Sequence, residues 1–335
     1  MSKYQENERK KAIERIENGN LFEDCKAGGK FRGKERDFVL LNGNFNLFKS
    51  IREEVKNYFE ENDISWWSGR KPTGHVLSSQ IACINHLFPL RNDKNEVLKI
   101  AKIICEDIID VLEIEANDIQ PAYISFEAVG GKDYLNECKG EKPTRGSNCT
   151  SIDALIYAKH KNGKNYILPI EWKYTEHYKK NEDKSLEPRK GEPEGTNGKG
   201  EERLNRYVNG TPYLIPNSEQ LAKFNDYRSS VYFFEPFYQL MRQTLWAEQM
   251  IAHKDDKDNE TIKAEDFIHT HIIPQENGDL LNYIYPCSRK DMETTWRECL
   301  QDQSKYKIIS PKDLLSNIDP NKYADLKNYL MERYW

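Results

Sequence analysis

Paired cysteines, long apolar runs and an excess of positive charge are all missing from this sequence of 335 residues. Its seven cysteines are odd in number and show no Cys-x-x-Cys spacing, which argues against a disulfide framework or a structural zinc site. No run of about 18 apolar residues occurs, so we predict no membrane span and no membrane partner. The charged N-terminus lacks the apolar stretch of a signal peptide, and we therefore expect a cytoplasmic protein.

The formal net charge is −5. A protein that coats nucleic acid would be basic overall, so the balance argues against that class. A net charge of −5 is still compatible with a local basic cleft. The segment from Lys26 to Arg36 carries five basic residues among glycines and is a candidate for part of such a cleft, with a solvated loop as the alternative.

Apolar spacing predicts an alternation of helices and strands. Helices are expected over residues 1–20, 45–62, 75–87, 93–112 (with Asp93 as N-cap) and 232–251 (beginning near Pro236). Strands are expected over residues 121–129, 150–158, 166–174 and 267–274. The rest of the C-terminal region is expected to be helical, with a loop near Ile309. Three successive strands followed by a helix and a further strand predict an α/β fold with a mixed sheet and helices on its faces.

We expect one compact domain with three regions. Residues 1–90 would form a helical N-terminal region, residues 91–275 the core, and residues 276–335 a helical C-terminal region. Within the core, residues 179–206 are rich in Lys, Glu, Gly and Pro and are predicted to form a mobile excursion outside the sheet.

The most specific chemistry lies in one predicted hairpin, where Asn162-Gly163 is a strong turn signal. Its strands carry Asp153, Glu171 and Lys173. Glu-x-Lys occurs at least five times in the chain, but only Glu171 lies in an apolar strand, and the period of two puts Glu171 and Lys173 on one face. Burying the Glu171 carboxylate and the Lys173 ammonium costs free energy unless the two groups pair or bind an ion. The alternative is a surface salt bridge on an edge strand.

A third acid, Glu127, lies in the preceding predicted strand. Mg²⁺ typically takes one or two carboxylates, keeps several waters and borrows phosphate oxygens from its substrate. Asp153 and Glu171 suit that role, and Glu127 would bind a second ion or orient a metal-bound water. We expect Lys173 to orient or deprotonate the attacking water.

The hairpin register sets a condition on this site. A plain two-residue turn at Asn162-Gly163 would place Asp153 opposite Trp172, on the wrong face for Glu171. We therefore predict a one-residue offset, either from a bulge at Pro169 or from a three-residue loop that ends in Gly163.

Ser-Ile-Asp153 followed by Glu171-Trp-Lys173 resembles the PD-(D/E)xK nuclease superfamily, and within it a bacterial restriction-endonuclease-like branch. The flanking segments that share the resemblance are Ile124–Glu127, Asn148–Asp153, Glu171–Glu176 and Phe237–Gln243. It covers roughly residues 70–310, and it departs from the pattern where isoleucine, not proline, precedes Asp153.

The resemblance implies a restriction-endonuclease-like core of helix, three strands, helix and strand. It also implies a Mg²⁺-dependent deoxyribonuclease in which Mn²⁺ substitutes for Mg²⁺. By position, Asp153 and Glu171 would be metal ligands and Lys173 the catalytic lysine, with Glu127 as an additional acid.

Several polar side chains are candidates for contacts with the phosphate backbone, each with an ordinary surface role as the alternative. Candidates on the predicted helices and after the polar excursion are Gln80, Arg203, Gln239, Arg242 and Gln243. The adjacent Trp66 and Trp67 would stack on bases or pack in the core.

We therefore predict a nuclease that acts on double-stranded DNA, of restriction type or related, and a homodimer because cutting both strands calls for two active sites. Two alternatives are a non-catalytic nucleic-acid-binding or interaction module on the same fold, and a metal-dependent hydrolase of a small phosphorylated substrate.

Overall fold

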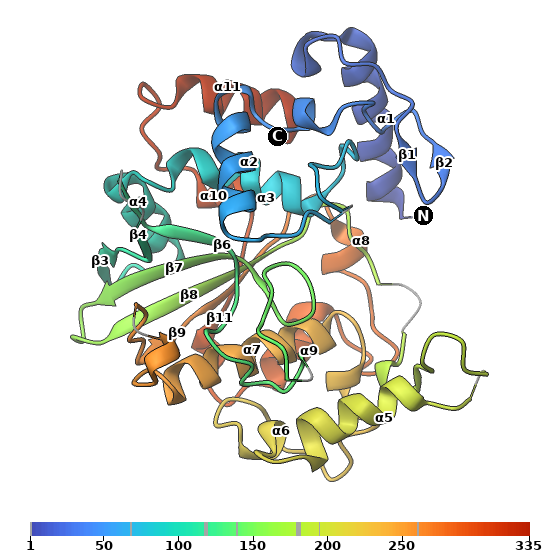
Figure 1. Ribbon diagram of the computed structural model, residues 1–335, viewed down its shortest axis with the longest axis vertical. Coiled ribbons are helices and arrows are strands. Elements are labelled where there is room, and N and C mark those ends of the chain that lie inside the picture. The colour runs from blue at the N-terminus through green and yellow to red at the C-terminus, as the bar shows by residue number, and fades with distance from the viewer. Residues whose placement is uncertain are drawn as a thin grey trace.

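A mixed seven-stranded sheet forms the centre of the molecule in the computed structural model (Figure 1). The structure describes residues 2–67, 69–116, 120–138, 140–178, 182–193, 195–259 and 261–335. The strands of the sheet are β3 (Ile108–Leu112), β6 (Ile124–Ala128), β7 (Ile152–His160), β8 (Asn165–Trp172), β9 (Asp266–Phe267), β10 (His269–Ile272) and β11 (Tyr306–Ile309).

The hairpin of β7 and β8 is the middle of the sheet. Both β3 and β6 pair antiparallel with β7, β3 along its C-terminal part and β6 along its N-terminal part. On the other side, β9 and β10 both run parallel to β8, and β11 runs parallel to β10. The sheet is thus five strand positions wide, and two of these positions are filled by pairs of short strands.

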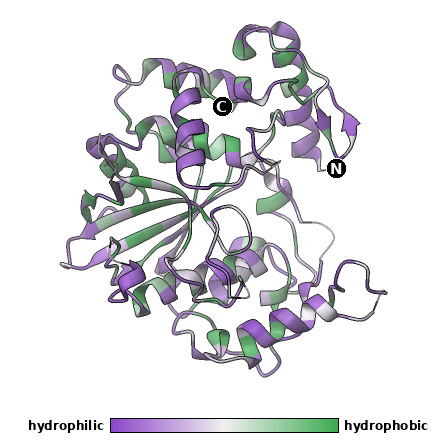
Figure 2. Ribbon diagram, viewed as in Figure 1, coloured by the Kyte–Doolittle hydropathy of each residue, from purple (hydrophilic) through white to green (hydrophobic). Residues whose placement is uncertain are grey.

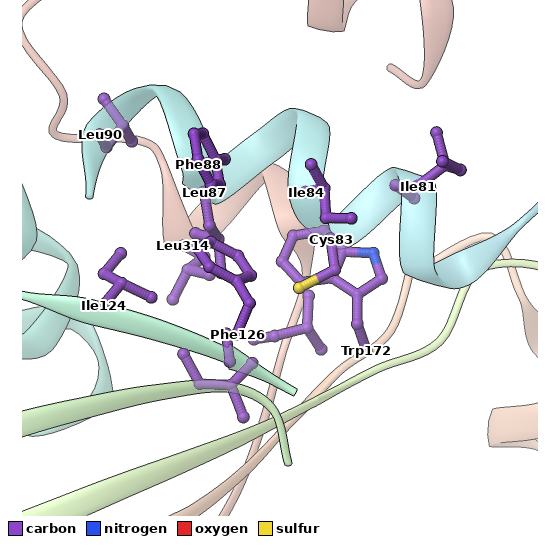
Figure 3. Close-up of a cluster of buried hydrophobic side chains, with 14 of the residues drawn as sticks. Ile81, Cys83, Ile84, Leu87, Phe88, Leu90, Ile124, Phe126, Trp172 and Leu314 are labelled. Atoms are coloured by element: carbon purple, nitrogen blue, oxygen red, sulfur yellow. The ribbon is translucent and has the colours of Figure 1, made fainter. Parts of the chain in front are cut away.

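Apolar side chains cover both faces of the sheet and form two separate cores. On one face, α3 points Cys83 toward Phe126 of β6 and Trp172 of β8 (Figure 3). The helices on this side are α1 (Lys3–Asn18), α2 (Arg52–Glu61), α3 (Ser79–Leu87), α4 (Lys94–Ile104), α10 (Pro311–Leu314) and α11 (Ala324–Arg333).

The second core lies between the opposite face and α7, whose buried residues include Leu240, Met241 and Leu245 (Figure 1). The helices of this half are α5 (Gly198–Leu204), α6 (Leu214–Asn217), α7 (Phe237–Ala252), α8 (Gly278–Leu281) and α9 (Met292–Glu298). The remaining strands form two small hairpins, β1 (Lys30–Phe31) with β2 (Lys34–Glu35), and β4 (Glu115–Ala116) with β5 (Pro121–Ala122).

This arrangement confirms the predicted fold class and core order, with α4, three strand positions, α7 and β10 following one another along the chain. The N-terminal helix and the start of the later helix after Pro236 also agree with prediction. In the part of the chain that the structure describes, no helix has the length and apolar character needed to cross a membrane. Hydrophobic residues are concentrated in the strands of the sheet and in α3, whereas α1 is largely hydrophilic (Figure 2).

Four predicted helical segments are wrong in extent. The helix expected over 93–112 ends at Ile104, and residues 108–112 form β3. Residues 306–308, expected to be helical, form β11 together with Ile309, where a loop was expected. The helix expected over 75–87 begins only at Ser79, where Ser78 caps it, and the one expected over 45–62 is helical in its α form only from Arg52. In β3 the apolar spacing fits either a helix or a strand, and pairing with β7 decides the outcome.

The polar excursion is structured where the structure describes it, while residues 179–181 and 194 of the predicted segment lie outside the described residues. Helix α5 packs so closely on a turn near Ser185 that a side chain on Gly200 would collide with the Ser185 carbonyl. Ion pairs from Lys199 and Arg203 to Glu187 join the two parts.

Candidate active site

The turn between β7 and β8 sets the register of the predicted site. Lys159 pairs with Asn165, and the pairing continues without interruption to Ala154 and Ile170. The loop therefore has three residues, 161–163, and ends in Gly163 at a φ of +89°, a conformation that glycine adopts without strain. This is the predicted one-residue offset, located in the turn, whereas Pro169 pairs regularly with Leu155.

One step beyond the last regular pair, the register places Asp153 opposite Glu171. The next backbone rung would join Trp172 to Ile152. Instead, the Trp172 N–H donates to Oδ2 of Asp153 over 2.7 Å. The Asp153 carboxylate thus ends the ladder where the two strands part.

Glu127 extends the same row onto β6. Its neighbours Phe126 and Ala128 pair with Ala154 and Ile152, so Glu127 lies opposite Asp153. Its φ of +49° is unusual for a residue with a side chain and marks a local distortion of the strand. The carboxylate accepts a 2.6 Å hydrogen bond from Nε2 of Gln80 on α3. Glu127, Asp153 and Glu171 therefore form one acidic row across three neighbouring strands.

Lys173 and two glutamines surround Glu171. The ammonium of Lys173 lies 2.5 Å from Oε1 of Glu171 and donates to Oε1 of Gln239 over 2.6 Å. Gln239 Nε2 donates to the same Glu171 oxygen over 2.7 Å, and Gln243 Nε2 donates to the other. Both glutamines come from α7, so this helix positions the strand carboxylate. The buried Oε1 of Gln243 has no partner among the described residues.

Burial and mutual repulsion shift the titration of the acids. Burial raises the pKa of Glu127 to about 7, to which the charge of Glu171 adds. Burial, Glu171 and Glu127 together raise the pKa of Asp153 well above its usual range. Burial, the largest single cause, would lower the pKa of Lys173, but Glu171, Tyr178, Glu176 and Asp153 together outweigh it, and the pKa is raised. The row therefore attracts positive charge, and Lys173 stays an ammonium.

The row lies in a cleft with a volume of about 810 Å³. Gln80, Gln239, Arg242 and Gln243 line this cleft together with the acids and Lys173. Arg242 is held by Glu137, which accepts from its Nε over 2.8 Å. The structure thus brings four of the five predicted nucleic-acid contacts to the site.

Arg203 is the one that it does not bring there. Its side chain is buried, donates to the Lys184 carbonyl and to Glu187 over 2.8 Å each, and does not line the cleft. The expectation of a phosphate contact has no geometric support at this position.

Two residues that bear on the cleft escaped prediction from the sequence. Glu137 is buried and accepts hydrogen bonds from Tyr207 and from two residues that line the cleft, Thr150 and Arg242, so it fixes the position of both. It belongs to one of the common Glu-x-Lys strings, which carried no signal. Arg9 of α1 also lines the cleft, although helical spacing alone gives no hint of that.

A comparison with known families connects this geometry to a group of proteins. The model of the family described as Restriction Endonuclease associating with ARP matches residues 2–335, and the chain therefore belongs to that family. No curated protein and no solved structure matches the chain. The family places the chain among nuclease-related proteins, in agreement with the predicted resemblance.

Proposed function

We propose that this restriction-endonuclease family member is a Mg²⁺-dependent nuclease that hydrolyses DNA phosphodiester bonds. The observation that carries the proposal is the acidic row of Glu127, Asp153 and Glu171 on three adjacent strands, with Lys173 bonded to Glu171 inside the cleft. A salt bridge on an exposed edge strand would look different, because β8 is paired on both sides and Glu171 and Lys173 are buried.

The donor set fits a hard divalent cation. Asp153 and Glu171 would hold Mg²⁺ or Mn²⁺, and Glu127 would bind a second ion or orient a water. Among the residues that the structure describes, no three His, Cys, Asp or Glu side chains are grouped so that they could hold a metal ion. Mg²⁺ typically takes only one or two carboxylates, keeps several waters and takes oxygens from its substrate. When bound, the ion would polarise the phosphate and acidify a coordinated water.

Lys173 would act through its positive charge. Because Glu171 raises the pKa of Lys173, the ammonium is a poor base at neutral pH. We assign it the task of orienting the attacking water and stabilising negative charge on the phosphate, with Gln239 fixing its position. Of the two roles expected from the sequence, orientation is thus favoured over deprotonation.

The α7 wall would hold the DNA backbone. Arg242 has a partly exposed side chain whose orientation is fixed by Glu137, and it faces the same cleft as the acids. A guanidinium held in this way contacts phosphate without regard to base sequence. Gln239 and Gln243 serve first to hold Glu171.

Cleavage of supercoiled plasmid DNA tests the proposal. The wild type should nick or linearise DNA with Mg²⁺ or Mn²⁺ and not with EDTA. Asp153→Asn and Lys173→Met should each lose at least about 100-fold in rate. The control is Asp110→Asn, a β3 carboxylate that pairs with Lys94 away from the cleft and should leave the rate unchanged. A wild type that binds DNA but cleaves neither DNA nor RNA would overturn the proposal in favour of a non-catalytic module.

The cleft volume favours one second candidate. About 810 Å³ lies within the roughly 300–1,000 Å³ typical of small-ligand pockets. A hydrolase of a small phosphorylated compound would cleave a chromogenic phosphodiester or a mononucleotide and leave plasmid DNA intact. If the protein cleaves the plasmid with substantially higher efficiency than it cleaves these small substrates, this candidate is excluded.

Cutting both strands of a duplex would call for two copies of the site. We propose a homodimer on DNA, formed by two chains related by a twofold axis. Sedimentation of the Lys173→Met variant with a short duplex should show a complex with two protein chains. A one-to-one complex would argue for strand nicking instead.

A further inference from the structure

The adjacent tryptophans Trp66 and Trp67 have different environments. Trp66 is buried and stacks on Phe59, with ring centroids 3.9 Å apart and an interplanar angle of 18°. Trp67 is 58% exposed and lines the cleft. Core packing therefore accounts for Trp66 and leaves the exposure of Trp67 unexplained.

Trp67 belongs to a group of three rings on the N-terminal side of the cleft. Its ring centroid lies 5.7 Å from that of Phe31 and 5.7 Å from that of His75, and Phe31 and His75 are 4.5 Å apart. All three residues line the cleft. We call Phe31, Trp67 and His75 the aromatic wall.

Positive charge accompanies the aromatic wall. The guanidinium of Arg32 lies 5.3 Å from the centre of the Phe31 ring, at the tip of the β1–β2 hairpin, and Arg9 of α1 lines the same side of the cleft. Arg32 belongs to the basic segment 26–36 noted in the sequence, so that segment does reach the cleft. Burial and the charge of Arg9 lower the pKa of His75 to about 4, and its ring is neutral at physiological pH.

A single side chain connects the aromatic wall to the acidic row. Oε1 of Gln80 accepts from the backbone N–H of Trp67 over 3.0 Å, while its Nε2 donates to Glu127 over 2.6 Å. The wall is thus separated from the acids by one amide group. A nucleotide whose phosphate meets the acidic row would place its own base, or that of its neighbour, at the wall.

We propose that the aromatic wall stacks an unpaired nucleobase next to the phosphate to be cleaved. Inside a duplex the faces of a base are covered by its neighbours, so an exposed ring such as Trp67 can stack only on a base of a single strand or on one extruded from the helix. Arg9 and Arg32 would neutralise the flanking phosphates. The substrate class is therefore DNA with unpaired bases at the cleavage point; this inference rests on the proposed function.

Binding measured in EDTA tests the wall without requiring cleavage. The probe is a single-stranded oligonucleotide with one 2-aminopurine, and its fully paired duplex is the comparison. The wild type should quench the fluorescence of the single strand. Trp67→Ala should bind it roughly tenfold or more weakly and lose the quenching, while Trp67→Phe retains most of both. Tyr213→Ala, an exposed aromatic residue away from the cleft, should behave as the wild type.

Unchanged single-strand affinity and quenching in Trp67→Ala, with an unchanged melting temperature, would overturn the proposal. Equal affinity of the wild type for the single strand and the fully paired duplex would do so as well. A wild type that quenches the single-stranded probe but does not cleave the plasmid would count against the nuclease function alone. A wild type that cleaves the plasmid, together with a Trp67→Ala variant that binds the single strand as tightly as the wild type, would overturn the stacking proposal and leave the nuclease function supported.

Discussion

Replacing Glu127 by glutamine should stabilise the metal-free protein above neutral pH. Burial raises the pKa of this carboxyl from an ordinary 4.5 to about 7, with a contribution from Glu171. The folded protein therefore holds the proton more tightly than the unfolded chain does. The stability linked to this proton is complete below about pH 4.5 and is lost as the pH rises through about 7. A difference of about 2.5 pKa units corresponds to about 3 kcal/mol of unfolding free energy.

The glutamine removes that loss because it cannot ionise, and its amide oxygen can still accept the hydrogen bond from Gln80. Urea unfolding in EDTA should show a gain of about 1–3 kcal/mol for Glu127→Gln near pH 8 and no gain at a pH of about 4.5. Added Mg²⁺ should increase the unfolding free energy of the wild type more than that of the variant. The ion relieves repulsion between charged carboxylates, and the variant has one carboxylate fewer.

Glu187→Gln is the matched control, because its carboxylate is shifted in the opposite direction. Despite some burial, hydrogen bonds from Lys199 and Arg203 lower the pKa of Glu187 to about 2. Its contribution is present above about pH 4.5 and is lost as the pH falls through about 2, so this variant should be less stable near pH 8. With partial exposure the loss should be about 1 kcal/mol. Equal stability of Glu127→Gln and the wild type near pH 8 would refute the reasoning about the acidic row.

Three further changes test separate parts of the structure. Gly163→Ala should lower stability by about 1 kcal/mol, since its φ is positive; a melting temperature equal to that of the wild type would contradict this. Arg203→Ala should lower stability by about 1–3 kcal/mol, because it removes buried hydrogen bonds to Glu187 and Lys184, and DNA affinity should not change; weaker DNA binding at full stability would reverse the assignment. Arg242→Gln should weaken DNA binding and reduce the slope of log K against log salt by about one, whereas an unchanged slope would exclude a phosphate contact.

The central pair of the site was within reach of the sequence. Acids inside apolar strands are rare enough to notice, and the period of two puts Glu171 and Lys173 on one face. The length of the turn was not within reach, because Asn162-Gly163 suits a two-residue loop as well as a three-residue loop that ends in glycine. The requirement that Asp153 face Glu171 was the only criterion that could choose between them, and the three-residue loop meets it.

Tertiary contacts decided the features that the sequence pattern missed. Residues 108–112 continue the apolar spacing of α4 and become a strand because β7 offers them a partner. Arg203 follows a polar segment, as a surface residue would, but α5 folds back on a turn near Ser185 and buries it. The aromatic wall joins residue 31 of the β1–β2 hairpin to residues 67 and 75 of two loops, and no periodicity in the sequence indicates these contacts.

Pro169 has a structural effect on the opposite side of β8 from the one considered for the hairpin. Lys173 donates its N–H to Ile272, and Ile268 donates its N–H to Ile167, so the odd-numbered residues of β8 face β9 and β10. Residue 169 would donate to Ile268 in the same series, but proline has no N–H. The parallel pairing is interrupted at this point, between Phe267 of β9 and His269 of β10, while its register is the same on both sides. The proline thus divides the neighbouring strand in two and leaves the pairing of β7 with β8, on which the acidic row depends, intact.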